Sequence, residues 1–533
     1  MPPSASPCLL VLLAAACGAD PGYAPEARDT TVPADVSPDT SPTGDVAALA
    51  DDAAAGATVT VIVVATIPVE TPSATPVVLA IGSAPERLVT LDCGAATTRC
   101  EGRLAMPAGN GTSLALRLAD GRQALNLDGT ARAVEPLALP EAERGPWTVR
   151  LQAERWGTPS ASPTPAVAFI VRPPASTPPH EALFVAGSLP ALGAWDGRGL
   201  RLEAAREGAH AAVLEGVPGG TDLAFKVTRG SWYTVEKGPG LEEIANRAGR
   251  VEPGRVTRVE ATPARWADVL EPGTGTLTGE VRRWEAVASA HLGATRDVLV
   301  WVPPGYRDDE TRRYPVLYAH DGQNMMDAET AFGGFEWGLD EALDAAVRAG
   351  DIPPVIAVAV GNTADRIDEY TPTASLDYGG GGLPDYGRFL AEELKPLIDG
   401  QFRTRTDAPD TGVMGSSLGG LASMWLGLAH ADVFGRLGVI SPSVWWDGRA
   451  ILGAVRGFEG TPAARVWVDI GTDEGDGAEP VADARALRDA LVARGWAEGG
   501  NLAYREYDGA AHNEAAWADR LPEVVRFLMA GPR

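Results

Sequence analysis

Lysine is scarce in this sequence. It occurs at three positions, Lys226, Lys237 and Lys395, so arginine carries nearly all of the positive charge. Against 45 basic residues stand 71 acidic ones, and the formal net charge is −26. A chain this acidic is repelled by phosphate backbones and anionic membrane surfaces unless its basic residues cluster, and the sequence contains no such cluster. No nucleic-acid partner is therefore expected.

Long apolar runs are missing beyond the first 20 residues, where none approaches the ~20 residues that span a bilayer. The apolar stretch 8–16 has the length of a signal-peptide core. It overlaps Leu13-Ala-Ala-Ala-Cys17-Gly, which resembles a bacterial lipobox. This resemblance implies a lipoprotein-type signal peptide over 1–17 and a lipid on Cys17. The protein is then exported to the cell envelope and reaches a membrane only through that anchor. Plain secretion and a misassigned start are the alternatives.

Cysteine is also rare, with four residues in the chain. Besides Cys8 and Cys17, only Cys93 and Cys100 remain, close together in sequence. Thiols oxidise in an exported protein, so these two are expected to form a disulfide. The alternative, a zinc site, would need more ligands than two cysteines without a nearby histidine supply. No metal and no cofactor is expected.

A chain of 533 residues is too long for one domain. Residues 18–55 are rich in Pro, Asp, Thr and Ser, which predicts a disordered linker. Residues 56–157 and 163–265 contain short β-branched segments separated by Gly and Pro turns, which predicts two β-sandwich domains. Residues 280–533 form the last domain.

The second β region contains four motifs in order. They are Leu183-Phe-Val-Ala-Gly187-Ser, Leu192-Gly-Ala-Trp195-Asp196, Leu223-Ala-Phe-Lys226 and Arg229-Gly-Ser-Trp232. These resemble the starch-binding modules of carbohydrate-binding family 20. The resemblance implies a glycan site made of Trp195, Lys226 and Trp232, in which indoles stack on sugar rings and the ammonium donates to hydroxyls. The alternative is an architectural spacer with Trp195 in its core.

The last domain alternates short apolar strands with segments of helical period. Strands are expected at 298–302, 315–319, 355–360, 413–414, 437–441, 466–470 and 502–507, and helices at 337–349, 383–398, 418–429, 481–494 and 514–529. This alternation predicts an α/β fold with a mostly parallel, doubly wound sheet.

A nucleophile motif, Gly415-Ser-Ser417-Leu-Gly419, stands between one such strand and an apolar helix. It matches G-x-S-x-G in the strand–turn–helix context of a nucleophile elbow, with Ser417 as the nucleophile. The chain order of such enzymes is serine, acid, histidine, and His512 is the histidine that follows outside the elbow helix. The acid is expected after strand 466–470, where Asp473 and Glu474 are both candidates.

Five motifs of this domain are found in order. They are His320-Asp-Gly-Gln-Asn324, Arg366-Ile-Asp-Glu-Tyr370, the elbow, Ser441-Pro-Ser-Val-Trp-Trp446 and His512-Asn-Glu-Ala-Ala-Trp517. Together they resemble the esterase D-like "putative esterase" family of alpha/beta hydrolases, which includes feruloyl, acetylxylan and enterochelin esterases. By family position the acid is Glu474, and the oxyanion hole combines the N–H groups of Leu418 and Gln323. Trp446 and Tyr370 line the substrate pocket or are structural.

The function expected is an exported serine carboxylic-ester hydrolase with Ser417, His512 and Glu474 as its triad, acting on feruloyl or acetyl esters of carbohydrate. Its partners are that ester and a glycan bound by the starch-binding-like module. The alternatives are a siderophore esterase, an acyltransferase, and a glycan-binding surface lipoprotein without activity.

Overall fold

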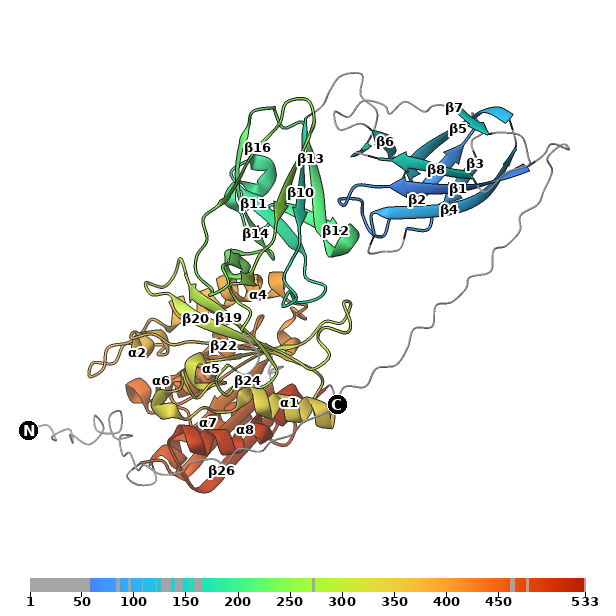
Figure 1. The fold of residues 1–533 in the computed structure, drawn as a ribbon. Helices are drawn as coiled ribbons and strands as arrows, with labels where there is room; N and C mark the ends of the chain where they lie inside the picture. Colours follow the sequence, from blue (N-terminus) through green and yellow to red (C-terminus); the bar gives the residue numbers. More distant parts are fainter. Residues whose placement is uncertain are drawn as a thin grey trace, which may run out of the picture.

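The computed structural model describes residues 58–531, except 83–86, 94–96, 108, 121, 126–135, 140–146, 154, 158–164, 271–273, 461–464 and 476–478. The predicted signal peptide, Cys17 and the linker 18–55 lie outside the described residues. Figure 1 shows three parts in chain order: a blue strand unit, a green strand unit and a yellow-to-red α/β unit. No described helix is long and apolar enough to span a membrane.

The α/β unit is built on an eight-stranded sheet in the order β19-β20-β22-β21-β23-β24-β25-β26. The strands are β19 (Glu280–Val287), β20 (Arg296–Val302), β21 (Val316–Ala319), β22 (Ile356–Val360), β23 (Thr411–Ser416), β24 (Arg436–Ile440), β25 (Arg465–Asp473) and β26 (Leu502–Ala511). The first two are antiparallel to their neighbours, and the other six run parallel. The predicted doubly wound α/β fold is confirmed.

Successive side chains of the central strands point to opposite faces of this sheet. Leu317 and Ala319 pack in a core with helices α1 and α8, whereas Val316 and Tyr318 belong to the core on the other face. The helices are α1 (Leu339–Ala349), α2 (Arg366–Glu369), α3 (Leu383–Arg388), α4 (Lys395–Gln401), α5 (Leu418–Ala429), α6 (Trp446–Gly457), α7 (Glu479–Ala493) and α8 (Glu514–Met529). Apolar side chains thus cover both faces, as a parallel sheet requires.

Several elements of the α/β unit differ from the sequence expectation, among them the four-residue helix α2, which was not predicted. Strand β19 and helix α6 were not predicted, and the expected helix 383–398 is three segments, with a π-helical turn η7 (Phe389–Leu394) between α3 and α4. Strand β19 carries Arg282, Arg283 and Glu285 among its apolar residues, which hides its alternation. Helix α6 begins with a left-handed turn at Asp447, Gly448 and Arg449, so its start does not follow the pattern from which a helix is predicted.

The green unit contains nine strands, seven of them in the order β16-β14-β11-β12-β13-β10-β17 and two in the pair β15-β18. These are β10 (Ala166–Val171), β11 (Leu183–Gly187), β12 (Leu200–Ala204), β13 (His210–Glu215), β14 (Asp222–Thr228), β15 (Glu236–Lys237), β16 (Arg247–Arg250), β17 (Val256–Ala261) and β18 (Arg265–Trp266). Phe169, Phe225 and Trp266 are buried in its core.

The blue unit places its strands in a three-stranded group, β4-β1-β8, and a six-stranded group, β3-β2-β5-β6-β9, with β7 on β5. These are β1 (Thr58–Thr66), β2 (Val77–Ile81), β3 (Arg87–Thr90), β4 (Arg99–Pro107), β5 (Gly109–Leu118), β6 (Gln123–Leu125), β7 (Pro136–Leu139), β8 (Trp147–Gln152) and β9 (Arg155–Gly157). A disulfide joins Cys93 to Cys100.

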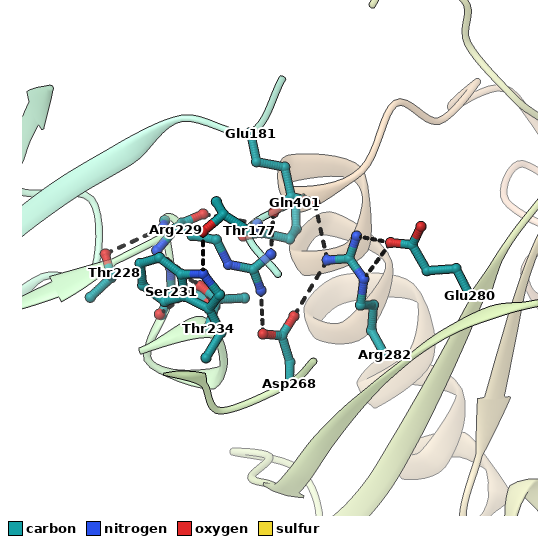
Figure 2. A network of polar contacts seen from close by, with 12 residues as sticks. Thr177, Glu181, Thr228, Arg229, Ser231, Thr234, Asp268, Glu280, Arg282 and Gln401 are labelled. Carbon is teal, nitrogen blue, oxygen red and sulfur yellow. Dashed lines mark hydrogen bonds and ion pairs between the residues drawn. The ribbon is translucent and has the colours of Figure 1, made fainter. Parts of the chain in front are cut away.

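A buried ion network joins the green unit to the α/β unit. Figure 2 shows Arg229 and Arg282 on either side of Asp268, with Glu181 contacting both guanidinium groups. Nearby, the side chain of Gln401 donates to the carbonyl of Arg229 at 2.8 Å. Gln401 is the last residue of α4. Three residues later, Thr404 pairs with Tyr314, which lies just before the start of the parallel strand β21. The green unit therefore docks on that edge of the sheet.

Candidate active site

The predicted nucleophile, Ser417, occupies the sharp turn between β23 and α5. Its backbone has φ 58° and ψ −122°, a strained conformation for a residue with a side chain. The turn is tight because glycines flank it: a Cβ on Gly415 would lie 3.0 Å from the carbonyl carbon of Gly419, and one on Gly420 would lie 2.7 Å from the carbonyl oxygen of Ile440. The sequence thus folds locally into the expected nucleophile elbow.

Two backbone bonds hold this turn against the next strand. The N–H of Ser417 donates to the carbonyl of Ile440, and the N–H of Ser443 donates to the carbonyl of Ser417. The Oγ atoms of Ser417 and Ser443 are 3.3 Å apart. Sequence analysis did not single out Ser443, although it belongs to the Ser441-Pro-Ser443 motif. No hydrogen bond joins Ser417 to His512 among the described residues.

His512 lies in the loop between β26 and α8 and is held by two neighbours. Its Nδ1 is 2.8 Å from Oε2 of Glu474, and its ring packs edge-on against Trp517 at 4.9 Å between centroids. The next residue, Asn513, caps α8 by accepting from the N–H of Ala516 at 3.0 Å. The helix therefore begins immediately behind the histidine and fixes the end of its loop.

Of the two carboxylates left open by the sequence, Glu474 contacts the histidine and Asp473 is exposed. The second oxygen of Glu474 accepts from Ser441 Oγ at 2.5 Å, from the N–H of Gly471 at 2.7 Å and from Arg520 at 3.1 Å. Burial raises the pKa of Glu474, but the hydrogen bonds from His512, Ser441 and Gly471 outweigh it and leave this pKa below its usual value. Glu474 thus stays ionised beside the imidazole.

A second buried carboxylate, Asp469, shares a partner with Glu474. Arg520 on α8 contacts both, at 2.9 Å from Asp469 and 3.1 Å from Glu474. Burial raises the pKa of Asp469 to about 6, although Arg520 and Trp467 favour its charged form. Sequence analysis missed this pair. The signal available was an aspartate inside the apolar strand 466–470 and an arginine on the apolar side of the last helix.

The predicted oxyanion donors lie at the starts of two helical turns. Leu418 is the first residue of α5, and Gln323 lies in a short 3₁₀ turn, η5 (Gly322–Asn324). N–H groups at such starts have no acceptor within their own helix. Asp321, the residue before η5, has a left-handed backbone conformation. Its carboxylate accepts two hydrogen bonds from Arg366, at 2.7 and 2.8 Å. Gln323 accepts through Oε1 from the N–H of Asn362.

The two aromatic residues proposed for the substrate pocket are both buried. Tyr370 accepts from the N–H of Asp321, and Trp446 donates to the carbonyl of Thr373. Their neighbour Trp445 is 43% exposed and packs against the exposed Tyr378 at 5.8 Å between ring centroids. Only Val444 separates Trp445 from Ser443 in the chain, so one member of this accessible aromatic pair lies in the segment that contacts the nucleophile.

The predicted glycan site is brought together in part. The indoles of Trp195 and Trp232 are 6.3 Å apart, and Trp232 donates to the carbonyl of Trp195 at 2.9 Å. Trp232 is 42% exposed. Lys226 is buried, and its ammonium donates to the carbonyl of Ile244 at 2.5 Å. The backbone of Trp195 has φ 72°, so this loop is held in an unusual conformation.

Residues 289–528 match the family model described as "Putative esterase". An uncharacterised Bacillus subtilis protein, YbbA, is 30% identical over 195 residues, which cover 35% of this chain and 72% of that protein. The chain belongs to the putative esterase family. A Xylanibacter ruminicola endo-1,4-beta-xylanase/feruloyl esterase is 25% identical to the esterase over 45% of this chain and 30% of that protein. An iron(III) enterobactin esterase of Dickeya dadantii is 31% identical over 28% of this chain and 30% of that protein.

Family membership identifies the esterase as a carboxylic ester hydrolase. The residues assigned to the reaction follow the carboxyl ends of four parallel strands: Gln323 after β21, Ser417 after β23, Glu474 after β25 and His512 after β26. Open α/β sheets bind their ligands at this edge. The position of the site is therefore set by strand direction.

Proposed function

We propose that this hydrolase is an exported serine esterase that removes feruloyl or acetyl groups from carbohydrate. The observation that supports it most is the hydrogen bond of His512 to a buried, ionised Glu474, at the same sheet edge as the strained Ser417. A nucleophile on an elbow, a histidine and an orienting acid are the parts that acyl transfer needs.

In the proposed reaction Ser417 Oγ attacks the ester carbonyl carbon while His512 Nε2 takes its proton. Glu474 holds the Nδ1–H tautomer and stabilises the imidazolium. The N–H groups of Leu418 and Gln323 donate to the carbonyl oxygen as it becomes an oxyanion, and each such donor typically contributes about 3–4 kcal/mol. His512 then protonates the leaving alcohol, and water, activated by the same imidazole, releases the acid from Ser417.

Two features support an aromatic or sugar-linked substrate. The Trp445–Tyr378 pair offers π faces to a feruloyl ring or to the C–H face of a sugar, and one relative is named a feruloyl esterase. The Trp195–Trp232 pair supports glycan binding by the green unit, with stacking rather than Lys226 as its main contribution because that ammonium is buried. A lipid on Cys17 would tether the enzyme to the cell envelope through residues 18–55.

The test is hydrolysis by the mature protein of 4-nitrophenyl acetate, methyl ferulate, acetylated xylan and an enterobactin-type triester. Ser417→Ala is expected to lower kcat about 10⁴-fold or more on every substrate that the native enzyme hydrolyses. Unchanged hydrolysis by that variant would reject the serine mechanism. Hydrolysis of the ferulate or xylan ester in preference to the triester is expected.

The second candidate, a siderophore esterase, rests on the 31% identity to an enterobactin esterase. Preference for the triester over both carbohydrate-type esters would select it. An acyltransferase would instead give acylated sugar when an acceptor glycan is added, at the expense of free acid.

A further inference from the structure

Three carboxylates that the ester hydrolysis does not use gather where α1 begins. They belong to Glu336, Asp340 and Glu341, and one oxygen of each lies within 4.8 Å of the other two. They face the segment 274–279, which leads from the green unit into β19. The cluster is thus placed at the entry of the chain into the esterase domain.

The innermost of these carboxylates, Asp340, is fully buried. Its Oδ2 accepts from the N–H of Thr278 at 2.6 Å, and its Oδ1 is buried without a hydrogen-bond partner. Glu336 also has a buried oxygen without a partner, whereas Glu341 accepts from the hydroxyl of Thr278 at 2.6 Å. Buried carboxylate oxygens normally have partners, so these vacant lone pairs indicate a missing ligand.

No positive side chain compensates this cluster: within the described ranges, none of the three carboxylates forms a salt bridge with Arg, Lys or His. The N-terminus of α1 favours acidic residues in its first turn, which accounts for the charge of Asp340 and Glu341. Glu336 precedes the helix, and Oδ1 of Asp340 has no hydrogen-bond partner. A bound cation would supply the missing partner to the buried oxygens of both Glu336 and Asp340.

We propose that Glu336, Asp340 and Glu341 bind Ca²⁺. Carboxylate oxygens are the ligands that hard divalent cations prefer. Ca²⁺ holds oxygens at about 2.3–2.6 Å, so ligands on opposite sides of the ion lie up to about 5 Å apart, whereas around Mg²⁺ they lie about 4 Å apart. One oxygen of each carboxylate lies within 4.8 Å of the other two, a separation that Ca²⁺ allows, and Ca²⁺ accepts the irregular geometry of such protein ligands more readily than Mg²⁺ does.

The proposed site is linked to the oxyanion loop through the backbone. The N–H of Trp337 donates to the carbonyl of Asn324 at 2.8 Å, and the N–H of Leu339 donates to the carbonyl of Met325 at 2.9 Å. Asn324 ends η5, the turn that carries Gln323. Bound Ca²⁺ therefore holds three segments together: the entry segment 274–279, the start of α1 and the loop with the second oxyanion donor.

The experiment uses the full chain, treated with EDTA and dialysed into metal-free buffer. Saturating Ca²⁺ is expected to raise the melting temperature of the native protein by about 5 °C. Tb³⁺, which resembles Ca²⁺ in size and oxygen preference, should show luminescence excited through the buried Trp337 and lost on adding Ca²⁺. One ion per chain is expected, with a weaker effect of Mg²⁺.

Three variants make the test specific. Asp340→Asn keeps the shape but should abolish both the Ca²⁺-induced shift and the Tb³⁺ signal, and Glu341→Gln, at an exposed position, does the same if the first variant fails to fold. Glu329→Gln, an exposed acid of the neighbouring segment, should respond like the native protein. An equal Ca²⁺ shift in Asp340→Asn, or no shift and no luminescence in the native protein, overturns the proposal. In the latter case Asp340 is buried as a neutral acid.

Discussion

At the scale of single residues, the choice of the acid shows how burial assigns a role. Asp473 and Glu474 are adjacent, and both follow strand β25. Glu474 accepts four hydrogen bonds, one of them from His512, whereas Asp473 is exposed. Strand β25 ends at Asp473, and Glu474 lies in the bend that follows, where its carboxylate is buried against His512 while that of Asp473 faces solvent.

Replacing Glu474 tests this assignment. Glu474→Gln keeps the shape but offers the wrong partner to the Nδ1–H of His512, so kcat should fall about 10³–10⁴-fold with little change in KM. Hydrolysis of 4-nitrophenyl acetate measures both constants. Asp473→Asn is the matched control and should stay within about twofold of the native enzyme. The reverse ranking of the two variants would make Asp473 the acid.

His320 supplies a pH-dependent part of the stability. Burial lowers the pKa of His320 to about 4, against about 6.5 in an unfolded chain. Between these values the unfolded state binds a proton that the folded state does not, so this contribution is complete above pH 6.5 and is lost as the pH falls toward 4. From pH 7 to pH 4.5 the loss is about 2–3 kcal/mol.

Urea unfolding of the native protein and of His320→Gln at both pH values measures this loss. The glutamine has no proton to gain, so the free energy of unfolding of the variant should fall about 2–3 kcal/mol less on acidification. Equal falls for the two proteins would mean that His320 is not the group responsible.

At the scale of elements, the turn between β23 and α5 depends on close backbone packing. A side chain at Gly415 meets the backbone of Gly419 and the ring of His320, both at 3.0 Å. Relieving these contacts would displace the backbone of the turn, and a close-packed core transmits that displacement to Ser417. The position of Ser417 therefore depends on a residue that takes no part in the reaction.

Gly415→Ala is therefore expected to lower kcat at least about 10²-fold through displacement of Ser417, with a loss of about 1–3 kcal/mol in the free energy of unfolding. The control is Gly453→Ala on α6, where a Cβ meets no atom within 4 Å and alanine is the better helix former. That variant should keep its activity and gain up to about 1 kcal/mol. Full activity of Gly415→Ala would contradict the packing argument.

At the scale of the whole molecule, the green unit and the residues assigned to ester hydrolysis lie at opposite ends of the parallel strands. The green unit docks where the parallel strands begin, through Gln401 and Arg229, whereas Ser417 and His512 follow the strand ends. Arg198, two residues after Asp196 and close to the tryptophan pair, donates to the carbonyl of Gly400 at the same junction. Glycan binding at Trp195 and Trp232 would thus hold the esterase on a polymer without occupying its reaction site.

The separation predicts independent effects. Trp195→Ala combined with Trp232→Ala should abolish sedimentation of the enzyme with granular starch and leave kcat and KM on methyl ferulate within about twofold of native values, since loss of stacking affects only the polymer. Trp445→Ala is the opposite control: it should raise KM for methyl ferulate and leave sedimentation unchanged. Retained sedimentation of the double variant would exclude this tryptophan pair as the glycan site.

The sequence by itself determined the features that depend on neighbouring residues. Period and composition gave the alternation of strands and helices, and the Gly-Ser-Ser-Leu-Gly spacing placed Ser417 between a strand and a helix, because these patterns act over a few residues. The tertiary structure decided what depends on contacts between distant segments. It brought Arg520 to Asp469 and Glu474, buried Asp340 against Thr278, and brought Trp195 together with Trp232. Sequence distance says little about such pairs, because sheet order and strand direction bring them together only when the whole chain is folded.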